Sequence, residues 1–160
     1  MRVLRLGADD ILRYRPLRLR ALELAPDAFG STLAEERDQP EGYWRARSER
    51  AHATLLAVSD AGEDVGICVI ASASGPDDVG LYSMWVEPKA RGLGAGDALV
   101  AEAIEVARGL GARRVVLEVA DVNTPAIRLY ARHGFAPTGR TGTMPPPREH
   151  ITETEMAFTL

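Results

Sequence analysis

The chain has 160 residues, of which 46% are hydrophobic and 26% charged, which is the size and composition of a globular domain with one hydrophobic core. Its formal net charge of −4 argues against the broad positive surface with which nucleic-acid-binding proteins neutralise phosphates. We therefore expect one domain over residues 1–160 and no nucleic-acid partner.

The single cysteine and the first ten residues bear on the cellular compartment. Cys68 has no second cysteine to pair with, and its position in the apolar run 65–71 predicts a small buried side chain. Residues 1–10 lack the apolar core of a signal peptide, and no stretch approaches about 18 uninterrupted apolar residues. We expect a cytoplasmic protein with no membrane segment.

The N-terminal third alternates helical and turn patterns after one strand. Residues 2–6 predict a strand, and a helix begins near residue 10 and continues to Pro26. Pro16 should break or kink this helix, so two short helices are as consistent with the pattern as one. A polar helix follows over about residues 40–50; its two aromatic residues could line an acceptor site, but they are more typical of a surface helix anchored to the core.

The middle of the chain predicts three consecutive antiparallel strands, over residues 53–60, 64–73 and 79–87. The last strand leads into a loop with glycine at positions 92, 94 and 96, and then into a helix with an apolar stripe that ends near residue 110. Glycines without Cβ atoms allow several N–H groups to turn toward one anion at a helix N-terminus. We therefore expect this segment to form the binding site of a diphosphate, called the diphosphate seat below.

The C-terminal part predicts a strand at 115–120, a helix at 124–133, and strands at 135–139 and 152–159 separated by a long loop. The strand at 115–120 must run parallel to the one at 79–87, because a helix makes the crossover between them. The order of elements predicts an α+β domain with a mixed sheet and helices on both faces.

Two other classes of glycine-rich loop fail on spacing. A dinucleotide-binding fingerprint requires glycine at position 97, where this chain has Asp97. A P-loop requires Gly-Lys-Ser/Thr, and no lysine follows Lys89.

Two motifs instead resemble those of the GCN5-related N-acetyltransferases (the GNAT family) of bacteria. The first is RGLGAG at 91–96 after VEP at 86–88, and the second is NTPAIRLYARHGF at 123–135. The segments LRLRAL at 17–22 and PDAF at 26–29 are similar to the entry helices of bacterial members, so the resemblance covers nearly the whole chain. The segment LEV at 117–119, with Asn123 and Tyr130, also gives a weaker resemblance to the ribosomal-protein N-terminal alanine acetyltransferases.

This resemblance implies a mostly antiparallel sheet of about seven strands that splays between the fourth and fifth strands, with the pantetheine arm of acetyl-CoA in the gap. It implies that the backbone of Met84 and Val86 bonds the pantetheine, that loop amides and Arg91 hold the diphosphate, and that Asn123 bonds a pantetheine amide. The residues implied to contact the coenzyme are Met84, Trp85, Val86, Arg91, Gly92, Leu93, Gly94, Ala95, Gly96, Asp97, Asn123 and Tyr130.

The reaction implied by the resemblance requires two proton transfers. Tyr130, with an ordinary pKa of about 10, suits a general acid for a departing thiolate of pKa about 8.5. Glu118 is a candidate base whose pKa burial could raise; the alternative is a carboxylate paired with Arg113 or Arg114. Glu87 is the second candidate base, and His133 is set aside because a helix C-terminus favours a cation in any case.

We therefore expect an N-acetyltransferase that moves acetyl from acetyl-CoA directly to a primary amine, on a small molecule or a peptide N-terminus, without a metal. The alternatives are a non-catalytic acyl-CoA sensor or regulatory module, which the presence of Tyr130 and Glu118 disfavours, and a partner-binding domain on the same fold. The residues that would choose the acceptor, in the entry helices and the loop 139–151, carry no decodable motif. Because members of the family are often dimers, a homodimer is left open.

Overall fold

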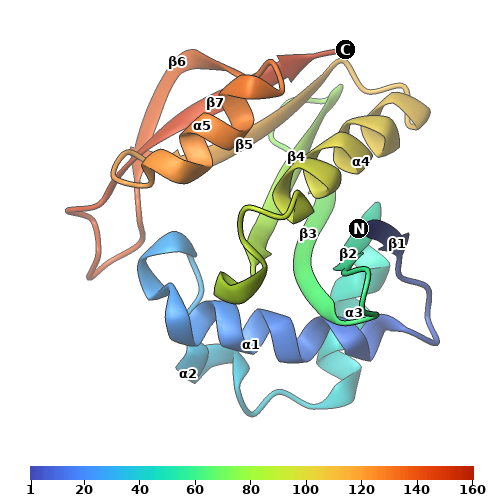
Figure 1. Ribbon diagram of the computed structural model, residues 1–160. Coiled ribbons are helices and arrows are strands. Elements are labelled where there is room, and N and C mark those ends of the chain that lie inside the picture. Colours follow the sequence, from blue (N-terminus) through green and yellow to red (C-terminus); the bar gives the residue numbers. More distant parts are fainter.

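The computed structural model describes all 160 residues and contains a seven-stranded sheet with the strand order β1-β2-β3-β4-β5-β7-β6 (Figure 1). The strands are β1 (Arg2–Arg5), β2 (Ala53–Val58), β3 (Asp64–Ser72), β4 (Asp78–Val86), β5 (Arg114–Ala120), β6 (Ala136–Thr143) and β7 (Thr152–Thr159). The helices are α1 (Tyr14–Leu24), α2 (Leu33–Glu36), α3 (Glu41–Arg50), α4 (Ala95–Gly109) and α5 (Thr124–Arg132), with 3-10 turns η1 (Ile11–Arg13), η2 (Pro26–Ala28) and η3 (Pro88–Ala90). Every neighbouring pair of strands is antiparallel except β4 and β5, which are parallel as the crossover helix predicts.

Hydrophobic cores lie on both faces of the sheet, because successive side chains of a strand point to opposite faces. On one face, Leu55 of β2 and Val115 of β5 pack with Leu99 of α4, and α5 adds to the same core. On the other face, Leu56 of β2 packs with Trp44 of α3 and with α1. The predicted α+β fold with helices on both faces is confirmed. The second core draws on strands β1 to β4 and on none of β5 to β7, so the β5–β7 half of that face is free of helices.

The sheet splays between β4 and β5, as the resemblance implies. The two strands pair only from Asp78 opposite Arg114 to Gly80 opposite Val116, and then diverge (Figure 1). At the closed end, the buried Asp78 carboxylate accepts hydrogen bonds from Arg114 Nε at 3.2 Å and Nη2 at 2.7 Å. Further along β4, Ser83 has a φ of 58° and lies where the pairing with β3 shifts register, so a bulge turns the free edge of β4 beyond the splay.

The first helix differs from the prediction at Pro16. The chain makes the turn η1 and then one helix from Tyr14, so Pro16 is the third helical residue. An N–H in the first turn has no intrahelical acceptor, and its absence costs the helix nothing there. The expected interior break at Pro16 is wrong for this reason.

Other elements agree with the sequence, with two exceptions. Trp44 is buried, which confirms that the aromatic residues anchor α3 to the core, and Cys68 is buried as expected. The short helix α2 was not predicted, and β6 runs on to Thr143 across an irregularity near Gly139, whose φ is 93°. None of the helices combines the length and apolarity that crossing a membrane would take.

Candidate active site

The loop between β4 and α4 presents a row of free backbone N–H groups. Gly92 and Gly94 have φ angles of 78° and 89°, which glycine adopts without steric cost. The amides of residues 92–97 donate to no backbone carbonyl, and those of residues 95–97 form the first turn of α4, where a helix offers no internal acceptor. Such an arrangement can bind several oxygens of one anion.

Gly96 and Asp97 fix α4 against α5. A Cβ on Gly96 would lie 3.1 Å from Leu129 Cδ2, so glycine allows the two helices to approach closely. The Asp97 carboxylate accepts hydrogen bonds from Arg132 Nε at 2.8 Å and Nη2 at 2.9 Å, and lies 2.8 Å from His133 Nε2. The hydrogen bond from Arg132 is the main reason that the pKa of Asp97 falls to about 2, and His133 adds to it. Because the carboxylate is bound to Arg132 and His133, Asp97 can contact an anion at the loop only through its backbone amide.

A cavity of about 840 Å³ extends from this loop along the end of β4. Most of the residues expected at the coenzyme line it; Leu93 points to solvent and Tyr130 lies beyond its edge. The Arg91 side chain donates to the carbonyl of Val86 at 3.1 Å, which places its guanidinium between the loop and the strand. The sequence did not predict the opposite wall, which consists of Ala25 and the turn η2.

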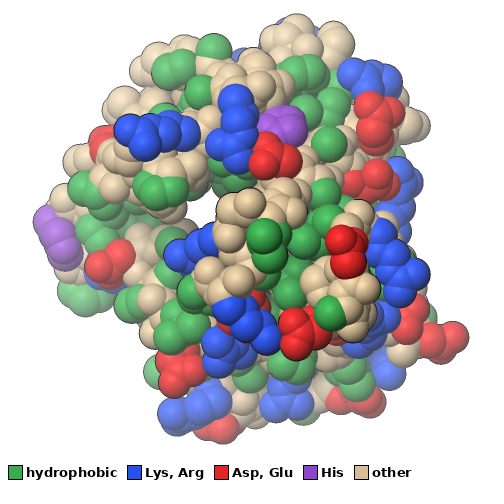
Figure 2. All heavy atoms as spheres, viewed as in Figure 1, with side chains coloured by type: hydrophobic (Ala, Val, Ile, Leu, Met, Phe, Trp, Pro, Cys, Tyr) green, Lys and Arg blue, Asp and Glu red, His purple; other side chains and the backbone are tan.

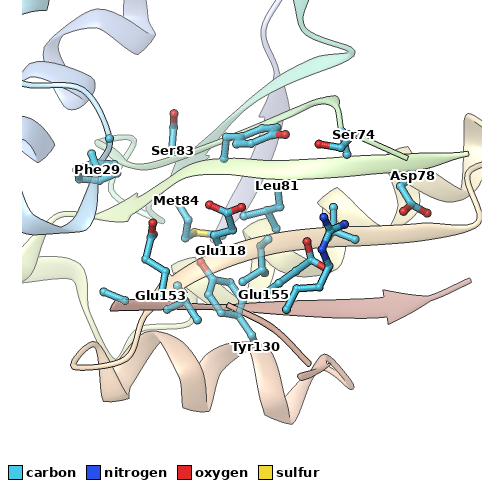
Figure 3. A pocket seen from close by; sticks show the side chains of 18 of the residues that line it. Phe29, Ser74, Asp78, Leu81, Ser83, Met84, Glu118, Tyr130, Glu153 and Glu155 are labelled. Carbon is cyan, nitrogen blue, oxygen red and sulfur yellow. The ribbon is translucent and has the colours of Figure 1, made fainter. Parts of the chain in front are cut away.

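A second cavity of about 760 Å³ lies on the helix-free β5–β7 half of the sheet (Figure 3). Its walls include Phe29 after η2, the bulge at Ser83, and side chains of β5 and β7. The two cavities meet where β4 and β5 part, because they share the lining residues Ala28, Met84, Ala120, Asn123 and Ala126. Figure 2 shows an opening between the part of the surface over α5 and the part over α1. A molecule in one cavity can therefore reach a molecule in the other.

Tyr130 of α5 reaches the junction of the two cavities through the splay. The residue is only 6% exposed, and its ring packs against Phe135 with centroids 5.8 Å apart. The hydroxyl makes no hydrogen bond within the protein and points into the second cavity (Figure 3). Burial raises the pKa of Tyr130 above its ordinary value of 10.0, so the hydroxyl keeps its proton at neutral pH.

Asn123 has a structural role besides the expected one. It is the N-cap of α5, and its side-chain oxygen accepts a hydrogen bond from the amide of Ala126 at 3.4 Å. The side-chain oxygen is used in the cap, and the NH₂ group of the same side chain lies beside both cavities.

Glu118 lies in the second cavity, but not as expected. Its side chain is exposed, because Leu117 and Val119 take the buried positions of β5, and the expectation of burial is wrong. The expected pairing with Arg113 or Arg114 is wrong as well, because both arginines lie against Asp78.

Glu87, the second candidate base, is buried in a salt bridge. Arg20 donates to both carboxylate oxygens, with Nη2 to Oε2 at 2.9 Å, and this contact is the main reason that the pKa of Glu87 is lowered. A carboxylate stabilised in its charged form is a poor proton acceptor. The geometry disfavours Glu87 as the base.

Two further carboxylates in the second cavity were missed by the sequence reasoning. Glu155 lies opposite Glu118 in the β5–β7 pairing, and Glu153 lies opposite Ala120. Both point into the cavity beside Glu118 (Figure 3). Only the pairing of β5 with β7 brings them to Glu118, and residues 152–159 carry no sequence signal for that register.

A buried charge network forms the wall of this cavity on the α1 side. Arg18 donates to both oxygens of Glu36 at 3.0 and 2.9 Å and to Ser83 Oγ at 3.3 Å, and Arg47 donates to Glu36 at 2.8 Å. Burial alone would raise the pKa of Glu36, but the hydrogen bonds and charges of the two arginines outweigh it and lower that pKa. The network ties α1, α2 and α3 to the bulge of β4.

Comparisons with known proteins agree with this geometry. The model of the acetyltransferase (GNAT) family matches residues 19–135. Streptothricin acetyltransferase from Streptomyces lavendulae is 32% identical over 131 residues, which is 81% of this chain and 65% of that protein. A putative ribosomal-protein alanine N-acetyltransferase from Bacillus subtilis is 30% identical over 62% of this chain and 64% of its own length. The chain thus spans just under two thirds of both relatives.

Among solved structures, a putative acetyltransferase from Salmonella typhimurium with its cofactor acetyl-CoA superposes with a TM-score of 0.81. The match covers 100% of this chain and 94% of that chain at 21% identity, so it is a likeness of fold.

Proposed function

The chain belongs to the acetyltransferase (GNAT) family, and from this premise we propose that it transfers an acetyl group from acetyl-CoA directly to a primary amine. The observation that carries the proposal is the junction of the two cavities at the splay of β4 and β5, with the Tyr130 hydroxyl pointing into it. One cavity holds the coenzyme and the other the amine.

The coenzyme binds along the cavity that begins at the glycine loop. The amides of residues 92–97 hold the diphosphate, and Arg91 adds a positive charge next to them. The edge of β4 beyond Gly80 has no partner strand on the β5 side, so the backbone from Met84 to Val86 bonds the pantetheine amides as a further strand would. The Asn123 NH₂ group lies at the junction and donates to the same arm.

Acetyl-CoA supplies a thioester carbonyl at the junction. The acceptor ammonium first loses a proton to Glu118, directly or through water, and the free amine then forms the new C–N bond at the carbonyl carbon. A strand-end N–H near Val86 stabilises the negative charge on the carbonyl oxygen. When the C–S bond breaks, the thiolate takes the proton of Tyr130, and the Tyr130 phenolate takes back the surplus proton from the nitrogen of the new amide. Cys68 is buried and its pKa is raised, so it does not serve as a nucleophile, which fits a direct transfer.

The test is release of the coenzyme thiol from acetyl-CoA in the presence of amines: diamines, amino acids, aminoglycosides and peptides with a free N-terminus. We expect thiol release with at least one class, and none without an amine. Acetyl-CoA binding without turnover on any amine would support a sensor instead, and the absence of binding would remove both functions.

The diphosphate seat is tested by calorimetry of acetyl-CoA binding to the Gly94→Val variant. A β-branched residue at a φ of 89° distorts the loop, so we expect the affinity to fall at least about tenfold. Gly62→Val is the matched control, because Gly62 has a φ of 84°, also faces open space, and lies outside both cavities. An equal loss in both variants, or none in either, contradicts the assignment of the loop.

A further inference from the structure

The second cavity has an acidic floor, made of Glu118, Glu153 and Glu155. Glu118 and Glu155 face each other across β5 and β7, and Glu153 is two residues from Glu155 on the same face. Directly opposed residues have Cβ atoms roughly 5 Å apart, and residues two apart in one strand are separated by about 7 Å. The three side chains therefore line one wall of the cavity, with Glu118 between Glu153 and Glu155 (Figure 3).

No salt bridge neutralises the three carboxylates of this wall. Arg114 is bound to Asp78, and Arg148 to the carbonyls of Phe29 and Gly30, while Arg140 lines the cavity without forming an ion pair. Burial raises the pKa of Glu153, the charges of Glu118 and Asp121 raise it further, and the charge of Arg148 lowers it in part. Glu155 has the hydroxyl of Thr138 as a donor at 2.8 Å, and Arg114 lies within range of its charge. The carboxylates of this cavity are therefore suited to bind a positively charged ligand.

Tyr130 is an independent sign that this wall faces a ligand. It comes from α5, on the opposite side of the sheet, and is 6% exposed, yet its hydroxyl lacks a partner and is aimed at the acidic wall through the splay (Figure 3). The rest of the side chain is buried, so the hydroxyl is the one part of Tyr130 that is open to the cavity, and a ligand there can reach it. A ligand bound at the acidic wall would give the Tyr130 hydroxyl a hydrogen-bond partner.

We propose that the acceptor is a small organic dication, with the amine to be acetylated between Glu118 and Tyr130 and a second, unreactive cationic group held by Glu153 or Glu155, which lie on either side of Glu118 (Figure 3). This inference rests on the proposed acetyl transfer and narrows its substrate. The spacing of the carboxylates sets the two charges roughly 5–7 Å apart, the span of a chain of about four or five carbon atoms. The second ammonium keeps its proton throughout and contributes binding, while Glu118 receives the proton of the first.

A matched pair of amines tests the proposal: 1,5-diaminopentane carries the second charge and 1-aminopentane does not. With acetyl-CoA saturating, we expect kcat/KM for the diamine to exceed that for the monoamine at least about tenfold, mainly through KM. The double variant Glu153→Gln/Glu155→Gln should reduce this ratio to about three or less. Glu149→Gln, the same change on the exposed loop before β7 and outside the cavity, should leave the ratio intact.

A binding measurement separates this inference from the proposed function. Calorimetry with coenzyme A present should show the diamine binding at least about tenfold tighter than the monoamine to the wild type, and about equally to the double variant, whose fold is checked by circular dichroism. If the wild type binds the diamine and the monoamine with equal affinity, the proposal of a dicationic acceptor is wrong, whether or not thiol is released. Equal rates of thiol release with both amines overturn it too, while leaving acetyl transfer in place; a diamine preference in binding without any thiol release overturns acetyl transfer alone.

Discussion

At the scale of single residues, Tyr130 is the position on which the chemistry depends most directly. Its side chain lies in the core around α5, and only the hydroxyl enters the second cavity. Burial raises its pKa above the ordinary value, so a proton is available at this site across the neutral and mildly alkaline range.

The Tyr130→Phe variant keeps the ring and removes the hydroxyl. We expect kcat to fall at least about tenfold, the lower end of what a general acid contributes, while the affinity for acetyl-CoA stays within about twofold. Steady-state kinetics and calorimetry measure the two quantities. Tyr43→Phe is the control, since Tyr43 is in α3 and outside both cavities. An unchanged kcat in Tyr130→Phe would remove the acid role.

At this scale, the sequence predicted residue positions well where all the residues of a motif lie in one continuous segment. The glycines of residues 92–96 and the motif at 123–135 each lie within one continuous stretch, so spacing was enough to predict the glycine loop before α4 and the helix that carries Tyr130. The surroundings of Glu118 depend on how distant strands pair. Its exposure, and its neighbours Glu153 and Glu155, follow from the register of β7, which no local pattern encodes.

At the scale of elements, the entry helices are held by one buried carboxylate. Glu36 of α2 binds Arg18 of α1 and Arg47 of α3, and Arg18 continues to Ser83 in the bulge of β4. A single acidic residue thus pairs with two arginines and positions three helices against the second cavity. The sequence did not predict this role, because a four-residue helix has too few positions to show a period.

Glu36→Gln removes the charge and keeps the shape of the side chain. Because the buried Arg18 and the partly exposed Arg47 then lack their counter-ion, we expect the free energy of unfolding to fall by about 3 kcal/mol. Urea denaturation measures the change, with Glu49→Gln on the exposed end of α3 as the control. A change of less than about 1 kcal/mol would mean that water reaches the arginines and replaces the carboxylate.

The loop between β6 and β7 is tied to the other side of the acceptor cavity by Arg148. Its guanidinium donates to the carbonyls of Phe29 at 2.8 Å and Gly30 at 3.1 Å, which connects residues 144–151 with the segment after η2. Met144 and Ile151 of the loop pack on Ala120 of β5 and so cover the end of the cavity.

Arg148→Ala releases this connection. We expect the KM of the acceptor to rise at least about threefold, because the cavity wall must then be ordered on binding, while the affinity for acetyl-CoA changes little. Initial rates at varied amine concentration measure the effect. Arg128→Ala, an exposed position on α5, is the control; a rise of KM in both variants would point to a general electrostatic effect and not to the loop.

At the scale of the whole molecule, the fold consists of two half-sheets joined by a short seam. Strands β1 to β4 carry α1, α3 and α4, strands β5 to β7 carry α5, and the halves pair only along the first residues of β4 and β5 (Figure 1). The short seam leaves the gap in which we propose that the coenzyme binds. Because few backbone hydrogen bonds join the half-sheets, their relative position depends on contacts between side chains. Asp97 of α4, bound to Arg132 and His133 at the end of α5, is the contact that closes the junction on the coenzyme side.

The contribution of Asp97 to stability should depend on pH in a defined direction. Its pKa is lowered from an ordinary 3.8 to about 2 in the folded chain, so its contribution is complete above the unfolded value near 4 and is lost as the pH falls through about 2. The side chain is 44% exposed, which limits the effect to about 1 kcal/mol, or a fall in Tm of at most about 4 °C for Asp97→Asn at pH 7. Thermal melts of both proteins from pH 7 to pH 2 should converge below pH 4. Asp38→Asn, an exposed aspartate whose only ionic neighbour is 3.7 Å away, should match the wild type throughout. A difference for Asp97→Asn that persisted at pH 2 would show that the aspartate acts by packing at the junction of the half-sheets and not by its charge.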